Sequence, residues 1–184
     1  MKLKQLILAF AFAIALFATT NANAAVDFFI RIDGIPGEST DTDHQGWIDV
    51  LSVSQGINRS VDTATGRLEA AKPGPFTFRK RIDKSSPLLA RALVTGEVIP
   101  KVEIELTRSY GTGGTRAVYY KYELTNVLVT SYSVSGAGAA DDVPAEDFSL
   151  NYTEIRFEYT DRDATTGAEK GKVEATWKVE EGEA

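Results

Sequence analysis

The residue of this chain best suited to chemistry is its single histidine, His44, which lies among acidic residues in the run from Asp41 to Gly46. An imidazole beside carboxylates can act as an acid–base group or a metal ligand, whereas the same run also fits a solvated loop. With one histidine and no cysteine, transition-metal coordination would be poor. A Ser–His pair would have to use His44. We therefore predict a solvated loop here, with no catalytic residue and no metal site.

Two further motifs imitate ligand sites. Asp161 and Asp163 resemble the start of a calcium-binding loop, but threonine and lysine stand where that loop needs glycine and glutamate. We predict a turn there. The glycines at 111–114 and 136–138 lack the strand-to-helix context of a phosphate-binding loop, and the chain has no G-x-S-x-G motif. We therefore expect neither a cofactor nor an enzymatic activity.

The composition limits the class of protein and its partners. The 184 residues suit one domain that buries roughly 70% of its unfolded surface, and the absence of cysteine excludes disulfides. The formal charge is −6; removal of residues 1–24, with two lysines and no acid, would leave 18 basic and 26 acidic residues, a net −8. Such a surface argues against nucleic acid and anionic membranes as partners.

Residues 1–24 have the pattern of a secretory signal peptide. Two lysines open the segment, residues 6–18 are a 13-residue apolar run, and an A-x-A cleavage site ends it at Ala22 to Ala24. A membrane anchor is disfavoured, because a helical span needs about 20 apolar residues. We predict cleavage after Ala24, a mature domain of residues 25–184, a secreted or periplasmic location, and no membrane partner after cleavage.

Beyond this leader, apolar and polar residues alternate with the period of β-strands. In the first run Val26, Phe28, Ile30 and Ile32 share one face. About eight such strands are predicted, at 26–32, 47–54, 76–82, 101–108, 118–124, 127–134, 148–159 and 173–179. A one-residue slip near Thr153–Glu154 predicts a β-bulge. Without an internal repeat or a linker, the pattern favours one small β-barrel domain.

The stretch that begins at Phe76 is predicted to change from strand to helix. Its strand should direct Phe76, Phe78 and Ile82 to one face. Ser86 and the proline after it are a helix start signal, and Gly96 is a stop signal. A helix of about nine residues is too short to be stable alone. We therefore expect its leucines to pack on the sheet.

Residues Gly56–Pro75 are the longest stretch without a clear pattern. Long structureless loops are uncommon in compact domains and are usually functional. We therefore expect this loop to have a function.

Four segments resemble the haemolysin-coregulated protein (Hcp) family of the bacterial type VI secretion system. They are AVDFFIRIDGIPGES at 25–39, WIDVLSVSQG at 47–56, FTFRKRIDKSSPLLARAL at 76–93, and the closing run at 122–159. IDKSSP, at 82–87, is the most specific piece. The resemblance covers nearly the whole predicted mature chain in order.

The resemblance implies a β-barrel of two curved antiparallel sheets with one short α-helix packed alongside. It further implies a structural protein without catalysis or cofactor. Six copies would form a homohexameric ring, and rings would stack into a tube inside a contractile sheath. A spike-tip protein would sit at the end of the tube, and small effector proteins would be held in its lumen.

The resemblance also implies roles for individual residues. The long loop corresponds to the region that reaches neighbouring subunits and rings, so Arg59, Arg67 and Lys72 are candidate partners for acidic residues of the next subunit. Ser52 and Ser54 are candidates for facing the lumen. The alternative for the loop is a flexible, solvated segment.

The leader sets this chain apart, because tube proteins of the family are assembled in the cytoplasm without one. Three explanations are open: a secreted paralogue that kept the fold and ring, an unusual export route, or a start downstream at a codon such as that of Val26. We favour the paralogue. Two functions follow as hypotheses: a self-assembling tube or ring protein, and a secreted β-barrel binding module, monomeric or oligomeric, that kept only the fold.

Overall fold

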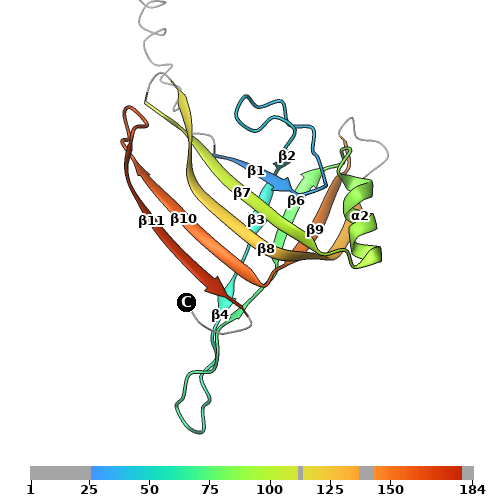
Figure 1. The fold of residues 1–184 in the computed structure, drawn as a ribbon, viewed down its shortest axis with the longest axis vertical. Helices are drawn as coiled ribbons and strands as arrows, with labels where there is room; N and C mark the ends of the chain where they lie inside the picture. The colour runs from blue at the N-terminus through green and yellow to red at the C-terminus, as the bar shows by residue number, and fades with distance from the viewer. Residues whose placement is uncertain (1–25, 112–113, 137–142, 180–184) are drawn as a thin grey trace, which may run out of the picture.

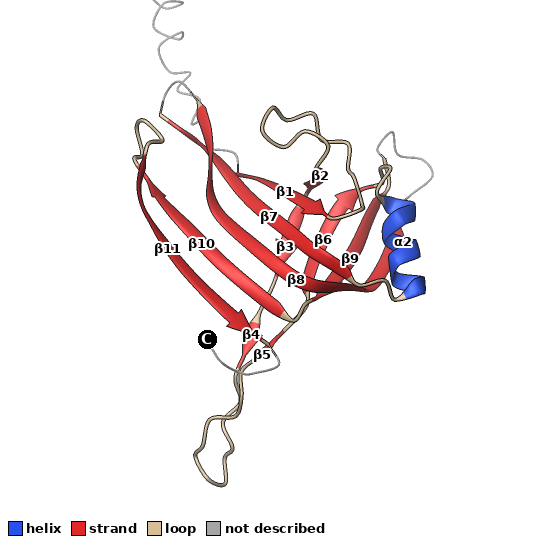
Figure 2. Cartoon of the chain, in the orientation of Figure 1, coloured by secondary structure: helices blue, strands red, loops and turns tan. Residues whose placement is uncertain are grey.

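The structure, a computed structural model, describes residues 26–111, 114–136 and 143–179, and the predicted leader lies outside them. The described chain is mainly strand, with one helix (Figure 2). None of its helices is long and apolar enough to cross a bilayer. The elements in chain order are β1 (Val26–Ile32), β2 (Ile48–Val50), β3 (Ser52–Ser54), β4 (Ile57–Asn58), β5 (Lys72–Pro73), β6 (Phe76–Arg81), α2 (Ser86–Thr95), β7 (Ile99–Tyr110), β8 (Thr115–Ser135), β9 (Ala145–Asn151), β10 (Glu154–Arg162) and β11 (Glu169–Lys178).

Two antiparallel sheets share one strand (Figure 1). The large sheet has the order β2-β1-β7-β8-β10-β11, and the small sheet has the order β8-β9-β6-β3. β8 belongs to both sheets, since its first part pairs with β7 and β10 while residues 128–135 pair with β9. The predicted pair of curved antiparallel sheets with one helix alongside is therefore confirmed.

The predicted closure into a β-barrel is wrong. The hydrogen-bonded order ends at β2 on one side and at β3 on the other, and these two strands do not pair with each other. They are consecutive parts of the predicted strand 47–54, separated by Leu51, whose N–H donates to the carbonyl of Arg79 at 2.8 Å. The chain passes here from the large sheet to the small one, which gives a two-sheet, sandwich-like arrangement.

The core fills the space between the sheets, because alternate apolar side chains of each strand point toward the opposite sheet. From the large sheet come Ile30, Ile104 and Leu124, all fully buried. From the small sheet come Phe78 and Phe148, whose stacked rings have centroids 5.0 Å apart. Of the residues predicted to share one face of the first strand, Ile30 and Ile32 are buried, whereas Val26 is 42% exposed.

The predicted strands 118–124 and 127–134 are a single strand, β8, which bends at Asn126. This residue has φ 49°, a left-handed conformation that asparagine tolerates better than most residues. At this bend the strand that pairs with β8 changes: β10 pairs with β8 before Asn126, and β9 pairs with β8 after it. The bulge predicted at Thr153–Glu154 is therefore the junction between two strands.

The helix α2 lies where the sequence predicts it. Pro87 occupies the first turn, and Gly96 ends the helix with φ 64°. Leu89 and Ala92 are buried and pack toward β8, as expected for a helix that depends on the sheet for its stability.

A buried charge cluster beneath α2 was not predicted. Lys80 takes the third inward position of β6, and Ile82 is exposed. The ammonium of Lys80 lies 2.8 Å from a carboxylate oxygen of Glu146 and 2.6 Å from one of Asp83, and it donates to the hydroxyl of Ser86 at 3.2 Å. The hydroxyl of Ser86 therefore takes part in this cluster, whereas the sequence predicted that it would cap the helix. The cluster joins β6, β9 and the start of α2.

Replacing Lys80 by methionine should lower the free energy of unfolding by about 3–5 kcal/mol, because the fully buried Glu146 would lose its cation. Urea unfolding monitored by circular dichroism measures this change. The control is Arg79→Met, which removes the partially exposed ion pair between Arg79 and Asp147 at 3.3 Å and should cost about 0–1 kcal/mol. Equal losses in the two variants would contradict the prediction.

Candidate functional site

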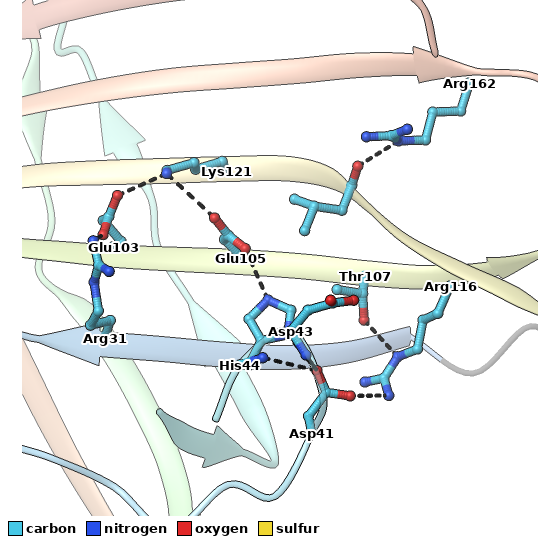
Figure 3. Close-up of polar contacts among 11 residues, drawn as sticks. Arg31, Asp41, Asp43, His44, Glu103, Glu105, Thr107, Arg116, Lys121 and Arg162 are labelled. Atoms are coloured by element: carbon cyan, nitrogen blue, oxygen red, sulfur yellow. Dashed lines mark hydrogen bonds and ion pairs between the residues drawn. The ribbon is translucent and has the colours of Figure 1, made fainter. Parts of the chain in front are cut away.

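His44 is buried, with 2% of its surface exposed, so the predicted solvated loop is wrong. Its Nδ1 lies 2.7 Å from a carboxylate oxygen of Asp41 and its Nε2 lies 2.9 Å from one of Glu105 (Figure 3). The ring stacks on Phe29 with centroids 4.0 Å apart. Both nitrogens are thus occupied by carboxylates, and the described residues contain no group of three acidic, His or Cys side chains placed to hold a metal. His44 fastens the loop at residues 33–47 to the outer face of the large sheet.

A charge network continues from this loop across the outer face of the large sheet (Figure 3). Lys121 of β8 lies 3.3 Å from Glu105 and 2.8 Å from Glu103, both of β7. Arg31 of β1 pairs with Glu103. Opposite charges on neighbouring strands stabilise the pairing of those strands, so this face satisfies most of its charges within the chain.

Asp41 is held in its ionised form by its neighbours. Burial would raise the pKa of Asp41, but the hydrogen bond with His44 and the guanidinium of Arg116, 2.8 Å away, together keep that pKa below its ordinary value. Arg116 also donates to the hydroxyl of Thr107 at 3.1 Å. The loop is therefore tied to β7 and β8 through Asp41 as well as through His44.

The turn predicted in place of a calcium loop is confirmed. A single carboxylate oxygen of Asp163 accepts the N–H groups of Thr165 and Thr166, both at 2.9 Å. The bond from Thr166, followed by that from Thr165, lowers the pKa of Asp163 to about 2. This carboxylate stabilises the turn between β10 and β11.

The stretch predicted as a patternless loop is an ordered hairpin, residues 56–74, which we call the arm. It projects from one end of the molecule (Figure 1). β4 pairs with β5 at its base, and Val61 forms a bridge with Leu68 further out. The side chains of Val61 and Leu68 are 53% and 64% exposed. The arm therefore presents apolar side chains that nothing in the described chain covers.

The three cations predicted as subunit contacts all lie on the arm. Arg59 donates its Nε–H to the carbonyl of Glu69 at 2.7 Å, and Arg67 and Lys72 are exposed. Within the described ranges, no acidic side chain pairs with any of the three. The three charges lie together on a projecting element. Their role as subunit contacts stays a prediction.

The two serines predicted for a lumen lie on β3, where both are exposed on the outer face of the small sheet. This face carries a row of small hydroxyl side chains, since Ser54 lies beside Thr77 in the register and the hydroxyl of Thr77 is 3.2 Å from that of Ser149. The ion pair between Arg79 and Asp147 interrupts the row. We call the set the hydroxyl face: Ser52, Ser54, Thr77, Ser131, Ser133 and Ser149.

The sequence did not predict a second surface, which lies on the large sheet. The large sheet extends beyond the small one (Figure 1), so part of its core-facing side has no sheet opposite it. Tyr159 and Val173 in this region are 43% and 69% exposed. One row deeper, where the core begins, Tyr122 packs edge-on against Phe76 at 5.0 Å, and burial raises its pKa to about 12. We call this row of side chains the aromatic face: Tyr159 and Val173 are exposed, and Phe28, Leu106 and Tyr120 are partly buried.

The alternation of aromatic residues on β8 and β10 was the available signal for the aromatic face. It indicated which side chains point inward. It did not indicate where the opposing sheet ends, because that depends on pairing between distant strands.

Comparison with known proteins places this geometry among those of one secretion system. The family described as "Type VI secretion system effector, Hcp" matches residues 29–159. Protein hcp1 of Pseudomonas aeruginosa is 32% identical over 158 residues, which are 84% of this chain and 96% of that protein. The "Major exported protein" of the same organism is 33% identical over 86 residues, 44% of this chain and 49% of that one.

Solved structures agree with this match. One titled "Structure of a type six secretion system protein" superposes with a TM-score of 0.78 at 31% identity, covering 86% of this chain and 98% of the other. Hcp1 from Salmonella typhimurium superposes with a TM-score of 0.69 at 27% identity, covering 85% and 97%.

Replacing Asp41 by asparagine should lower the free energy of unfolding at pH 6 by about 1–3 kcal/mol, because charged hydrogen bonds to His44 and Arg116 are lost. Since the folded pKa of Asp41 lies below its ordinary value of 3.8, its stabilisation is complete above that value and disappears as the pH falls through the folded value. The difference in the free energy of unfolding between wild type and Asp41→Asn should therefore become smaller below about pH 4. Urea unfolding at pH 6 and pH 3 measures it.

The control for this experiment is Asp43→Asn, on the same loop but exposed, which should change stability by no more than about 0.5 kcal/mol at either pH. If the difference in the free energy of unfolding between wild type and Asp41→Asn is the same at pH 6 and pH 3, the role given to the Asp41 carboxylate is contradicted.

Proposed function

This chain belongs to the Hcp family of the type VI secretion system, and from that premise we propose that it is a structural protein whose copies assemble into rings of six that can stack into a tube. The family supports a secreted structural role, and both nitrogens of the one histidine are engaged by carboxylates. Nothing in the described geometry indicates catalysis. The observation that carries the proposal is the aromatic face.

The aromatic face supports self-association because it is an apolar sheet surface without a cover. Tyr159 and Val173 are its most exposed members, and β11 beside it pairs only with β10, which leaves a sheet edge. Tyr159 and Val173 are neighbours across β10 and β11, and exposed apolar side chains that adjoin one another favour an interaction site. A contact between this face and a different surface of the next copy is heterologous, and such contacts close into a ring when the rotation allows.

The hydroxyl face supports a lumen role for Ser52 and Ser54. Both serines are exposed on the same side of the small sheet, and their neighbours in the register are small or paired side chains. We propose that this face lines the ring and contacts small effector proteins in transit. By family membership, the outer partners would be the sheath around the tube and a spike-tip protein at its end.

The arm supports contacts between subunits. It projects from the body (Figure 1) and carries Arg59, Arg67 and Lys72, none of which has an acidic partner in the described chain. We propose that these cations meet acidic residues of a neighbouring copy.

A second candidate, a secreted binding module, is favoured by one hollow of about 290 Å³ at the base of the arm. Ile57, Phe157 and Trp177 line it, and Arg59 lies among its walls. A hollow with apolar walls and one cation would bind a ligand that has an apolar body and an anionic group. In this alternative the chain keeps the family fold without building a tube.

The leader proposal has a direct test. We propose that residues 1–24 direct export and are removed, so protein recovered from the periplasm and the medium should begin at Ala25 when its N-terminus is sequenced. An exported protein that still begins at Met1 would contradict cleavage. The cytoplasmic fraction of the same cells is the control, in which uncleaved chain is expected.

Light scattering coupled to size-exclusion chromatography should give a particle six times the mass of the protomer. Replacing Tyr159 by glutamate should dissociate it, since a charge would be buried without a partner at a cost of several kcal/mol per contact, about 3–5 in comparable sites. The control is Val94→Glu, because Val94 is 86% exposed on α2, away from the aromatic face. A wild-type protein that stays monomeric at high concentration would favour the binding module.

A further inference from the structure

The hollow of about 290 Å³ at the base of the arm has walls from two distant parts of the chain. It lies where β4 and the end of β11 come together (Figure 1). The residues that form its walls include Ile57, Arg59 and Ala71 of the arm, and Phe157, Ala175 and Trp177 of the large sheet. A molecule that fills this hollow therefore contacts the arm and the large sheet at the same time.

The walls of the hollow are mostly apolar, and part of them belongs to the core. Trp177 is only 7% exposed, and the ring centroid of Phe157 lies 5.7 Å from that of Tyr122. Ile57 on the arm is 45% exposed, so its side chain leaves apolar area in contact with water. Small-molecule sites combine such apolar walls with a few polar groups that orient the ligand. A ligand with an apolar body would remove this area from water.

The charge of the hollow is opposite to that of the chain. The sequence has 26 acidic and 20 basic residues, yet among the described residues that line the hollow Arg59 is the only charged one. Three other hollows of the described chain have carboxylates in their walls, among them Asp41, Asp33 and Asp83. The hollow at the base of the arm therefore favours an anion over a cation.

The guanidinium of Arg59 is held in place but is not neutralised. Its Nε–H donates to the carbonyl of Glu69 at 2.7 Å, which restricts the direction of the side chain. Its other N–H groups have no acceptor in the part of the chain that the structure describes. A guanidinium with free N–H groups can bind a carboxylate through two parallel hydrogen bonds.

We propose that a small monocarboxylate with an apolar body binds in this hollow and fastens the arm to the large sheet. Its carboxylate lies on Arg59, and its apolar body lies between Ile57 and Trp177. The volume is near the lower limit of ligand pockets, about 300 Å³, which favours a short aliphatic or aromatic body. The inference rests on the hollow that supports the second candidate function, and it holds equally for a chain that assembles into rings. Because the ligand binds only where the arm adjoins the sheet, binding stabilises that arrangement.

Octanoate is the probe for this site. It should change the tryptophan fluorescence of the purified chain in a saturable way. Replacing Trp177 by phenylalanine should remove the change, because Trp47, the other tryptophan, lies outside the hollow. Isothermal titration calorimetry measures the affinity in every variant. Hexanoate should bind about tenfold more weakly than octanoate, since each buried methylene contributes about fourfold.

Charge variants test the recognition of the carboxylate. Arg59→Gln should weaken octanoate binding at least about fivefold, because hydrogen bonds to a charged group are lost, and should leave the binding of uncharged octanol unchanged. Ala175→Glu, at an exposed position of the wall, should weaken octanoate binding at least about tenfold through like-charge repulsion. The matched control is Arg67→Gln, an arginine of the same arm outside the walls of the hollow, which should bind octanoate as wild type does.

Hydrogen exchange tests the fastening of the arm. With saturating octanoate, the amides of residues 57–74 should exchange at least about threefold more slowly, since local opening of the arm competes with binding. The amides of α2, which lies away from the hollow (Figure 1), are the control and should exchange at the same rate with and without octanoate.

The outcomes separate this site from the ring. If octanoate gives no saturable signal, or binds Arg59→Gln as tightly as wild type, the carboxylate site is overturned and the ring proposal still stands. Binding that leaves the exchange of the arm unchanged overturns the fastening. A particle of six-fold mass that binds octanoate as described supports the site in a ring-forming chain. The same binding by chains that never exceed the mass of the protomer supports the site and overturns the ring.

Discussion

β8 supplies one backbone to two sheets, and the rest of the architecture follows from that constraint. Its first part lies between β7 and β10, and its last part pairs with β9. Neighbouring strands are rotated relative to one another by sheet twist, so a strand of 21 residues carries its two ends in different directions. The bend at Asn126 increases this divergence. The small sheet can therefore cover only one end of the large sheet.

The three exposed sheet surfaces consequently differ in chemistry. On the outer face of the large sheet, Lys121 and its neighbours neutralise one another, and His44 secures the loop above them. The hydroxyl face carries small polar side chains, and the hydroxyls of Thr77 and Ser149 lie 3.2 Å apart. The aromatic face leaves the side chains of Tyr159 and Val173 in contact with water, and removing apolar area from water is the dominant favourable term in association. A partner that covers this face would therefore gain from apolar area that the fold leaves exposed.

Local chemistry was sufficient to predict the helix and most of the strands, but not the hairpin of the arm, the continuity of β8 or the closure of the sheets. Pro87 and Gly96 define α2 through φ restrictions that act within one turn, and alternation placed Phe76 and Phe78 correctly. Lys80 was missed because its partner Glu146 is distant in sequence. His44 was misjudged for the same reason, since Glu105 supplies its second carboxylate. The prediction of a closed barrel was wrong because closure requires two edge strands to pair, and the alternation of residues within one strand does not indicate which edges pair.

The arm projects from one end of the protomer (Figure 1), which gives the protomer a chemical polarity. Any column in which all copies point the same way has one terminus that displays the exposed cations and aliphatic side chains of the arm. A protein that caps this terminus needs an acidic hollow with apolar walls. The two ends of such a column therefore differ because of the monomer surface itself.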